Sequence, residues 1–395
     1  MRPSSAYFPI WRPPIKTPSI ATTPESRSNP DRVRVGVVGA GLIAQVMHLH
    51  YLRELSDRFQ ISAICDIAPE NAAASARRYG VPAVHTDWRD LLREPIDAIL
   101  VLTAGSHAPM AIAAAKAGMH VLVEKPMCFS TAEAAAMVEA AASANVTLMV
   151  AYNKRYDPAY LRFVDEAAAL SDARFLRVTT LESAIQPYVA HYPLAPVGRP
   201  PDDVLAGLRT ETDASITGAI GDADTFLRWT YQSVLLDTLV HEINAVRGLL
   251  GEPDRLDYVD LRQGSLTVML RFGSLPVAIN WIDLPGIASY KMEFALYDPA
   301  RRLTLSFPSP FLRSEPTILE IEDGDVGAAR LVVSREITSY ESGFKNELIA
   351  FHEAIVRGTK PPTTGADALH DIALCQAIIA CQVSGRPIDN PTRAA

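Results

Sequence analysis

A glycine turn between a short apolar run and a helical segment constrains the fold of this chain more than any other feature. After the run VRVGVV come Gly39-Ala40-Gly41-Leu42-Ile43-Ala44, and the apolar spacing then becomes helical. The pattern is G-x-G-x-x-A, whose glycines let the backbone approach a pyrophosphate at a helix N-terminus. Alone, it is also typical of an ordinary strand-to-helix turn. From its context we expect a dinucleotide-binding turn with cofactor contacts from Gly39, Gly41, Leu42 and Ile43.

The segments around this turn alternate between strand-like and helix-like patterns. DAILVLT is almost wholly apolar, as is typical of a parallel strand buried on both faces. Ser130 and Glu133 have the spacing of a capping box at the start of an alanine-rich helix. Such alternation indicates a doubly wound parallel sheet. We expect residues 33–152 to form an α/β Rossmann domain.

Residues 153–390 have a different texture, with many consecutive strand-like runs. In SLTVMLRF, apolar residues alternate with Thr267, Met269 and Arg271, which is the period of a sheet packed on one face. We expect an α+β domain with a mostly antiparallel, open-faced sheet. Helices are predicted at about 233–250, 344–357 and 366–384, and residues 198–225 look like an insertion that is partly helix or loop.

Composition limits the location and the partners. Seven of the first 30 residues are proline, so residues 1–32 are predicted to be a disordered tail outside both domains. The net charge of −8 argues against nonspecific binding to nucleic acid or to an anionic membrane. No uninterrupted apolar run approaches the length of about 18 residues that spans a membrane. Four cysteines without a CxxC pair fit a reducing compartment, so we expect a cytoplasmic protein.

An acidic residue ends the second predicted strand. Asp66 follows QISAIC and stands where a carboxylate accepts hydrogen bonds from ribose hydroxyls and repels a 2′-phosphate. The next residues are Ile67, Ala68 and Pro69, so no cation follows closely. The sequence therefore predicts NAD in preference to NADP.

A lysine stands at the end of another buried strand, in the run MHVLVEKP. Ligands of doubly wound sheets lie beyond the carboxyl ends of the strands, so Glu124 and Lys125 would border the cofactor cleft. A lysine there can stabilise an alkoxide or help to move a proton. The alternative is a surface lysine that pairs with Glu124.

The helix expected over 233–250 carries Asp237 and His241, one turn apart and on the same face as Asn244. Histidine is the side chain best suited to exchange a proton near neutral pH, and a carboxylate one turn away can orient it or hold a substrate hydroxyl. The alternative is a solvated polar face. No HExxH motif or Cys/His cluster indicates a metal.

Taken together and in this order, these motifs resemble the Gfo/Idh/MocA family, named for glucose–fructose oxidoreductase, inositol dehydrogenase and a rhizopine-catabolism protein. The resemblance includes AGMHVLVEKPM and the run NELIAFHEAIVRGTKPPTTGADALHDIALCQAI near the end of the chain. Family members are NAD(P)-dependent oxidoreductases that act mostly on sugars and cyclitols. The resemblance implies that His241 exchanges the hydroxyl proton, that Lys125 polarises the oxygen and that Asp237 orients the substrate.

The resemblance also implies further site residues, for which the local sequence pattern gives weaker evidence. Thr103-Ala104-Gly105-Ser106-His107 is one residue shorter than the family's T-P-x-x-x-H and lacks its proline. Thr103 and His107 are predicted cofactor contacts, although His107 is equally suited to capping or packing. Arg155 and Tyr156 are expected to contact substrate, or else to brace the junction of the domains. Glu182 is a weaker candidate at the end of a strand.

The resemblance leaves three functions open. The first is an NAD-dependent oxidoreductase of a sugar, glycoside or cyclitol. The second is a non-catalytic NAD- and sugar-binding regulator, and the retained Lys125, Asp237 and His241 argue against it. The third is a glycoside-cleaving enzyme that uses NAD transiently. The resemblance also implies a homodimer or homotetramer formed through the second sheet.

Overall fold

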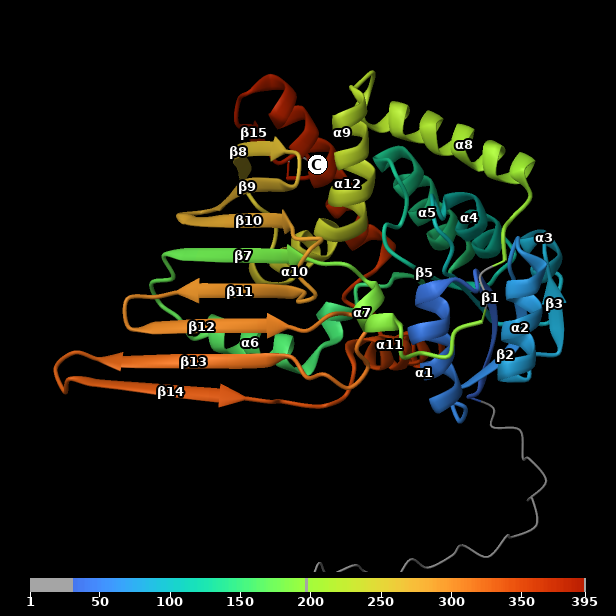
Figure 1. Ribbon diagram of the computed structural model, residues 1–395, viewed down its shortest axis with the longest axis horizontal. Helices are drawn as coiled ribbons and strands as arrows, with labels where there is room; N and C mark the ends of the chain where they lie inside the picture. The colour runs from blue at the N-terminus through green and yellow to red at the C-terminus, as the bar shows by residue number, and fades with distance from the viewer. Residues whose placement is uncertain (1–30, 196–197, 394–395) are drawn as a thin grey trace, which may run out of the picture. The chain divides into compact units, whose positions relative to one another are not determined.

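The protein was analysed as a computed structural model that describes residues 31–195 and 198–393, which fold around two sheets (Figure 1). Residues 1–30 of the expected tail lie outside the described residues. From Asp31 onward the chain forms one compact unit, so the domain boundary expected after Tyr152 stays a prediction.

The first sheet has six strands in the order β3-β2-β1-β4-β5-β6, and every pair is parallel. The strand order reverses between β1 and β4, the point beyond which such sheets bind ligands. This confirms the expected doubly wound fold. The strands are β1 (Val33–Val38), β2 (Phe59–Cys65), β3 (Ala83–His85), β4 (Ala98–Val101), β5 (His120–Val123) and β6 (Leu148–Val150).

Helices cover both faces of this sheet. Along β4, Ile99 and Val101 face one core with the fourth and fifth helices, whereas Ala98 and Leu100 face another core with the first helix. The predicted capping box of Ser130 and Glu133 is present. The helices of this half are η1 (Ala44–His48, a π-helix), α1 (Leu49–Glu54), α2 (Pro69–Tyr79), α3 (Trp88–Leu91), α4 (Ala108–Lys116) and α5 (Thr131–Ala144).

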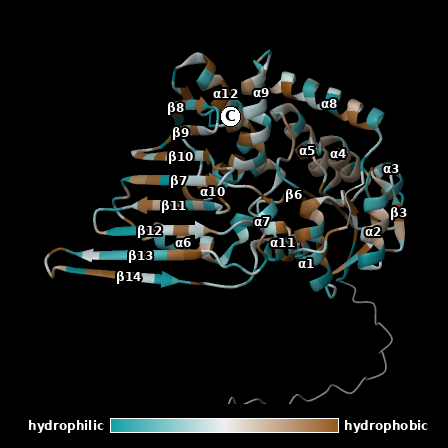
Figure 2. Cartoon of the chain, in the orientation of Figure 1, coloured by the Kyte–Doolittle hydropathy of each residue, from teal (hydrophilic) through white to brown (hydrophobic). Residues whose placement is uncertain are grey.

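The second sheet has nine strands in the order β14-β13-β12-β11-β7-β10-β9-β8-β15, and only β7 and β10 pair in parallel among the described strands. The expected, mostly antiparallel sheet is confirmed. Figure 2 shows both hydrophilic and hydrophobic colours on β12–β14, and in β12 the buried residues Leu303, Leu305 and Phe307 alternate with less buried ones. The strands are β7 (Phe175–Glu182), β8 (Arg255–Arg262), β9 (Ser265–Phe272), β10 (Leu275–Asp283), β11 (Lys291–Tyr297), β12 (Arg301–Phe307), β13 (Ile318–Asp325), β14 (Arg330–Glu336) and β15 (Ile388–Asp389).

The helix expected over 233–250 is longer and less regular than predicted. It comprises α9 (Thr225–Trp229), the π-helix η3 (Thr230–Leu239) and α10 (Val240–Leu250), which follow one another directly. At the end of η3, the amide of Val240 bonds the carbonyl of Leu235, five residues back. A π-helical turn holds more residues than an α-helical turn and often occurs at functional sites.

The remaining helices join the two sheets. The insertion is mainly α8, of which only Ile216 is buried, and Ser215 of α8 donates a hydrogen bond to Glu133 of α5 (2.8 Å; Figure 1). In the part of the chain that the structure describes, α12 is the one helix apolar and long enough to span a membrane by composition, but most of its apolar residues lie in the core. The helices are η2 (Asn153–Tyr156, a 3₁₀-helix), α6 (Pro158–Ala168), α7 (Gln186–Val189), α8 (Asp202–Ile220), α11 (Gly343–Arg357) and α12 (Gly365–Ser384).

Candidate active site

The turn after β1, residues Gly39–Ala44, has a backbone that leaves space for a ligand, and we call it the cofactor turn. Gly39 has φ of +96°, and a Cβ there would lie 2.7 Å from the carbonyl carbon and oxygen of Leu102. A side chain at Gly41 would meet nothing within 4 Å. The turn therefore leaves open space over Gly41 at the start of the helical segment, which fits a pyrophosphate held by backbone amides. Leu42 and Ile43 are half-buried beside it.

Asp66 lies under the same turn. Its Oδ2 accepts a hydrogen bond from the amide of Ala40 (2.7 Å), and its Oδ1 accepts from the amide of Ala68 (2.8 Å) and from Asn71 (3.3 Å). The side chain thus holds the turn to the start of α2. A carboxylate has about four acceptor sites, so these three bonds leave room for a ribose hydroxyl.

Lys125 follows β5 and reaches across to the second half of the chain. Its ammonium donates to Oδ1 of Asp237 at 2.9 Å and also to the carbonyl of Asp237. The structure therefore brings together two residues that lie far apart in the sequence. The alternative pairing of Lys125 with Glu124 is wrong, because Glu124 is buried and binds Nε2 of His48 (2.6 Å). Burial raises the pKa of Glu124, but the hydrogen bond and charge of His48 outweigh it, and the net pKa is lowered.

His241 lies one residue into α10, with its ring edge-to-face against Tyr152 (5.9 Å between centroids). Burial, then the charges of Lys154 and Lys125, lower the pKa of His241 well below its usual value. Its Nδ1 is enclosed and has no hydrogen-bond partner among the described residues. The imidazole is therefore neutral near pH 7 and able to accept a proton.

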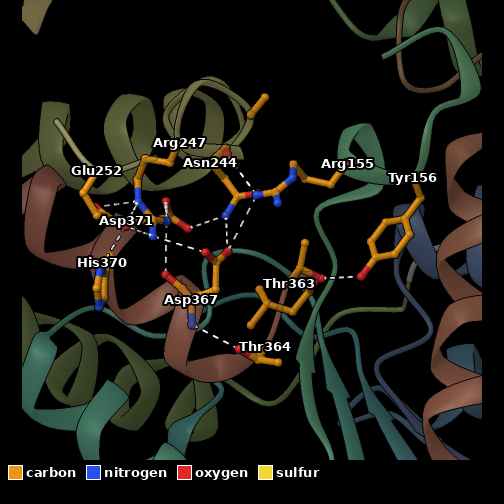
Figure 3. Close-up of polar contacts among 12 residues, drawn as sticks. Arg155, Tyr156, Asn244, Arg247, Glu252, Thr363, Thr364, Asp367, His370 and Asp371 are labelled. Carbon is orange, nitrogen blue, oxygen red and sulfur yellow. Dashed lines mark hydrogen bonds and ion pairs between the residues drawn. The ribbon is translucent and has the colours of Figure 1, made fainter. Parts of the chain in front are cut away.

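Asn244 departs from the expected arrangement. It does not join Asp237 and His241, because its amide donates to Asp367 (2.9 Å) and Asp371 (2.8 Å) of α12. The π-helix places Asp237 and the α-helix places Asn244, so the regular spacing assumed for one continuous α-helix does not hold. Figure 3 shows Asn244 in a network with Arg247 on the side of α10 that faces α12.

Arg155 and Tyr156, the predicted substrate contacts, also belong to this side of the molecule (Figure 3). Arg155 donates to the carbonyl (3.2 Å) and to Oδ1 (3.3 Å) of Asn244. The hydroxyl of Tyr156 shares a hydrogen bond with Thr363 (2.7 Å). Both side chains are thus committed to contacts between elements, and a substrate contact from either stays a prediction.

His107 and Thr103 lie after β4. His107 is buried, and its two ring nitrogens each lie 2.8 Å from a backbone carbonyl, that of Pro126 and that of Thr103. Burial lowers the pKa of His107 despite these contacts. His107 thus ties the loop after β4 to the segment after Lys125. The hydroxyl of Thr103 is buried without a partner among the described residues. Cofactor contacts from both stay predictions.

Lys154 is a residue that the sequence reasoning missed. Only 5% of the residue is exposed, and its charge contributes to the lowered pKa of His241. It follows β6 as Lys125 follows β5, so the strand-end argument that selected Lys125 also points to it. Beside His241, Glu242 is fully buried and accepts a hydrogen bond from Thr180 of β7. We call Lys125, Lys154, Asp237, His241 and Glu242 the substrate-side cluster.

This arrangement suits the oxidation of an alcohol or the reduction of a ketone. The ammonium of Lys125 is close enough to lower the pKa of the His241 imidazole. Lys125 follows β5, so it lies at the same edge of the parallel sheet as the cofactor turn after β1. No group of three or more His, Cys, Asp or Glu side chains that could hold a metal occurs among the residues that the structure describes.

Comparisons with known proteins agree with the fold described above. The model of a family described as "Oxidoreductase family, NAD-binding Rossmann fold" (GFO_IDH_MocA) matches residues 33–152. The chain is 24% identical to myo-inositol 2-dehydrogenase of Thermotoga maritima over 351 residues, which are 85% of this chain and 92% of that protein. It is 23% identical to the uncharacterized oxidoreductase YrbE of Bacillus subtilis over 361 residues, 90% of this chain and 96% of the other.

Among solved structures, levoglucosan dehydrogenase in complex with NADH superposes with a TM-score of 0.70 at 20% identity. The match covers 91% of this chain and 99% of that one. At this identity the likeness establishes the fold of nearly the whole chain.

Proposed function

This chain belongs to the Gfo/Idh/MocA family of oxidoreductases, and we propose that it transfers a hydride between NAD and a hydroxyl or keto carbon of a sugar, glycoside or cyclitol. The observation that carries the proposal is the meeting of Lys125 and Asp237 beside the neutral imidazole of His241. The substrate class is supported by the relatives named myo-inositol 2-dehydrogenase and levoglucosan dehydrogenase.

Each residue has a distinct part in the proposed reaction. His241 takes the hydroxyl proton, which its lowered pKa permits near neutral pH. Lys125 stabilises the negative charge that develops on the oxygen, and Asp237 holds Lys125 and a neighbouring substrate hydroxyl. In the reverse direction, His241 returns the proton to the alkoxide oxygen.

The cofactor turn fits a dinucleotide, and Gly39, Gly41, Leu42, Ile43 and Asp66 would hold it there. NAD supplies the hydride acceptor or donor when bound. Asp66 favours NAD over NADP because its carboxylate repels a 2′-phosphate, and no cation follows in Ile67, Ala68 or Pro69.

The test is NADH absorbance across a panel of cyclitols, sugars and glycosides, with His241→Ala and Lys125→Ala as comparisons. We expect turnover in the wild type and its loss in both variants, with NAD binding retained. Turnover without net NADH would favour the glycoside-cleaving alternative. Binding of NAD and sugar without turnover of any substrate would favour a regulator.

We also propose a cytoplasmic homodimer or homotetramer with domains at 33–152 and 153–390. The edge strand β14 supports association, because Leu331 (61% exposed) and Val333 (54%) offer apolar surface to solvent. Light scattering of the wild type and of Val333→Lys tests the association, since a charge at a buried interface would shift the protein toward monomer.

A further inference from the structure

A stretch from the second half of the chain lies against the two helices that flank the cofactor turn. We call this stretch, which leads from α7 to α8, the crossing segment, and its described residues are 192–195 and 198–199 (Figure 1). The amide of Ala195 donates a hydrogen bond to Oε1 of Gln45 on η1 (2.8 Å). The amide of Gly198 donates to Oδ1 of Asn71 on α2 (2.7 Å). One side chain from each helix therefore holds a backbone amide of the crossing segment.

Gln45 and Asn71 also hold the cofactor site itself. Nε2 of Gln45 donates to the carbonyl of Ala40 in the cofactor turn (2.9 Å). Nδ2 of Asn71 donates to Oδ1 of Asp66 (3.3 Å), the carboxylate that supports this turn. Gln45 is 4% exposed and Asn71 is 5% exposed. Each buried amide thus joins the cofactor site at its nitrogen to the crossing segment at its oxygen.

The two ends of each amide depend on one another. If the crossing segment moved away, the side-chain oxygens of Gln45 and Asn71 would be left buried without a donor, which is unfavourable. If the side chains turned to find another donor, they would lose their bonds to Ala40 and Asp66. The position of the crossing segment therefore restrains both the cofactor turn and its supporting carboxylate.

The crossing segment fits closely against the start of α2. A Cβ at Gly198 would lie 2.8 Å from Oε2 of Glu70 and 3.1 Å from Cβ of Ala68. The carbonyl of Pro193 accepts a hydrogen bond from Arg78, near the other end of α2. A large side chain at position 198 would therefore push the segment away from α2.

The beginning of the crossing segment is anchored to η1. The hydroxyl of Tyr192 donates to the carbonyl of Phe311 (2.7 Å), and its ring lies 4.4 Å from the guanidinium of Arg313. Nε of Arg313 in turn donates to the carbonyl of Val46 on η1 (2.6 Å). The crossing segment is thus fixed on both sides of its contact with Gln45, and it is a firm support for that side chain.

We propose that Gln45 and Asn71 are positioning residues for the cofactor, which use the crossing segment to keep Ala40 and Asp66 in place and thereby slow the release of NAD. A site that is already held in its binding geometry loses less entropy on binding, and such a gain acts mainly on the dissociation rate. The inference rests on the proposed function, because it takes NAD to occupy the cofactor turn. It needs no substrate turnover, so it is measurable separately.

The first test displaces the crossing segment and leaves the cofactor turn unchanged. Gly198→Leu places a large side chain against Ala68 and Glu70. Gly218→Leu on α8, where a Cβ meets nothing within 4 Å, is the matched control. With stopped-flow fluorescence on the full chain, we expect NADH release about tenfold faster in Gly198→Leu and unchanged in Gly218→Leu. Equal release rates in the two folded variants overturn the proposal.

A double-mutant cycle tests whether the effect passes through Asn71. Asn71→Leu removes both hydrogen bonds of the amide and should also speed NADH release about tenfold. Adding Gly198→Leu to it should change the rate by less than about twofold more, because the link is already broken. Two effects that multiply in full would overturn the proposal. The KM for NAD should rise in each variant while the KM for the alcohol stays unchanged, a split that a general loss of stability would not produce.

Gln45→Met serves if Gly198→Leu does not fold, because it keeps the length of the side chain and removes both of its hydrogen bonds. Faster NADH release supports the proposal, and an unchanged rate overturns it. If the wild type binds NADH without turning over any substrate and the variants release it faster, the proposed function fails and the inference stands. If the wild type turns over substrate and the variants release NADH at the wild-type rate, the inference fails alone. A wild type that binds no NADH overturns both.

Discussion

The cofactor turn and the substrate-side cluster lie on the same side of the parallel sheet but are built in opposite ways. The cofactor turn consists of consecutive residues whose backbone makes the site, and Asp66 holds it from the next strand. The substrate-side cluster consists of side chains from the segment after β5 and from η2, η3 and α10, and two of them, His241 and Glu242, have a buried polar atom without a partner among the described residues. The cofactor turn is a rigid backbone site that suits a dinucleotide. The substrate-side cluster is a group of charged side chains that suits one particular substrate.

If the cofactor turn and the substrate-side cluster act separately, removal of the base His241 should abolish catalysis but leave NAD binding intact. We expect His241→Ala to lower kcat by about 1,000-fold, because general-base catalysis contributes of that order. NAD affinity, measured by fluorescence quenching, should stay within about twofold of the wild type. A large loss of NAD affinity would contradict the separation of the two regions.

Changes in the cofactor turn should have the opposite signature. Gly39→Ala forces a side chain into a positive φ and against the backbone of Leu102, so we expect lower stability and about 100-fold weaker NAD binding. Gly41→Ala meets no protein atom within 4 Å, so it should weaken NAD binding about tenfold without changing the melting temperature.

Gly207→Ala on α8, where a Cβ also meets nothing, is the matched control for Gly41→Ala. It should leave NAD binding unchanged and raise stability slightly, because alanine is favoured over glycine inside a helix. If Gly41→Ala also leaves NAD binding unchanged, the open space over Gly41 is not the dinucleotide site.

The two regions also differ in how far the sequence predicts them. The cofactor turn and the fold around it depend on local spacing, so the strand, turn and helix could be placed from Val33 to Asp66. Lys125, Asp237 and His241 could be selected because family motifs preserve their order. Strand β8 is harder to recognise in the sequence, because its apolar pattern is interrupted by four charged residues, Arg255, Asp257, Asp260 and Arg262.

The rest of the substrate-side cluster depends on tertiary packing. The π-helical stretch that carries Asp237 has no signal in the residue pattern, so the expected alignment with Asn244 was wrong. The burial of Glu242 follows from its contact with Thr180 on a distant strand. Only Lys154 could have been found, by applying the strand-end argument once more, to β6.

A substitution of Asp66 tests whether the cofactor turn and its supporting carboxylate also discriminate between NAD and NADP. Asp66→Asn keeps the shape but removes the charge that accepts from Ala40 and Ala68, so we expect about fivefold weaker NAD binding. NADP binding should weaken less or improve, because the repulsion of the 2′-phosphate is lost. The exposed Glu70→Gln on α2 is the charge control. Equal losses for both cofactors would mean that Asp66 serves only the turn.

The smallest effect on activity is expected on the side of α10 that faces α12. Tyr156→Phe removes the hydrogen bond to Thr363, so urea unfolding should show a loss of about 1 kcal/mol in the free energy of unfolding. The kcat/KM should stay unchanged, because the tyrosine is buried and its hydroxyl is already used within the protein. Thr363→Val also removes the hydrogen bond that the Thr363 hydroxyl donates to the carbonyl of Val150 (2.8 Å), so it should cost more than Tyr156→Phe. The double variant should cost little more than Thr363→Val alone, since the bond between the two side chains is already lost there. A raised KM for Tyr156→Phe with unchanged stability would instead show that Tyr156 contacts the substrate. The substrate-side cluster would then include Tyr156 as well as Lys154 of η2.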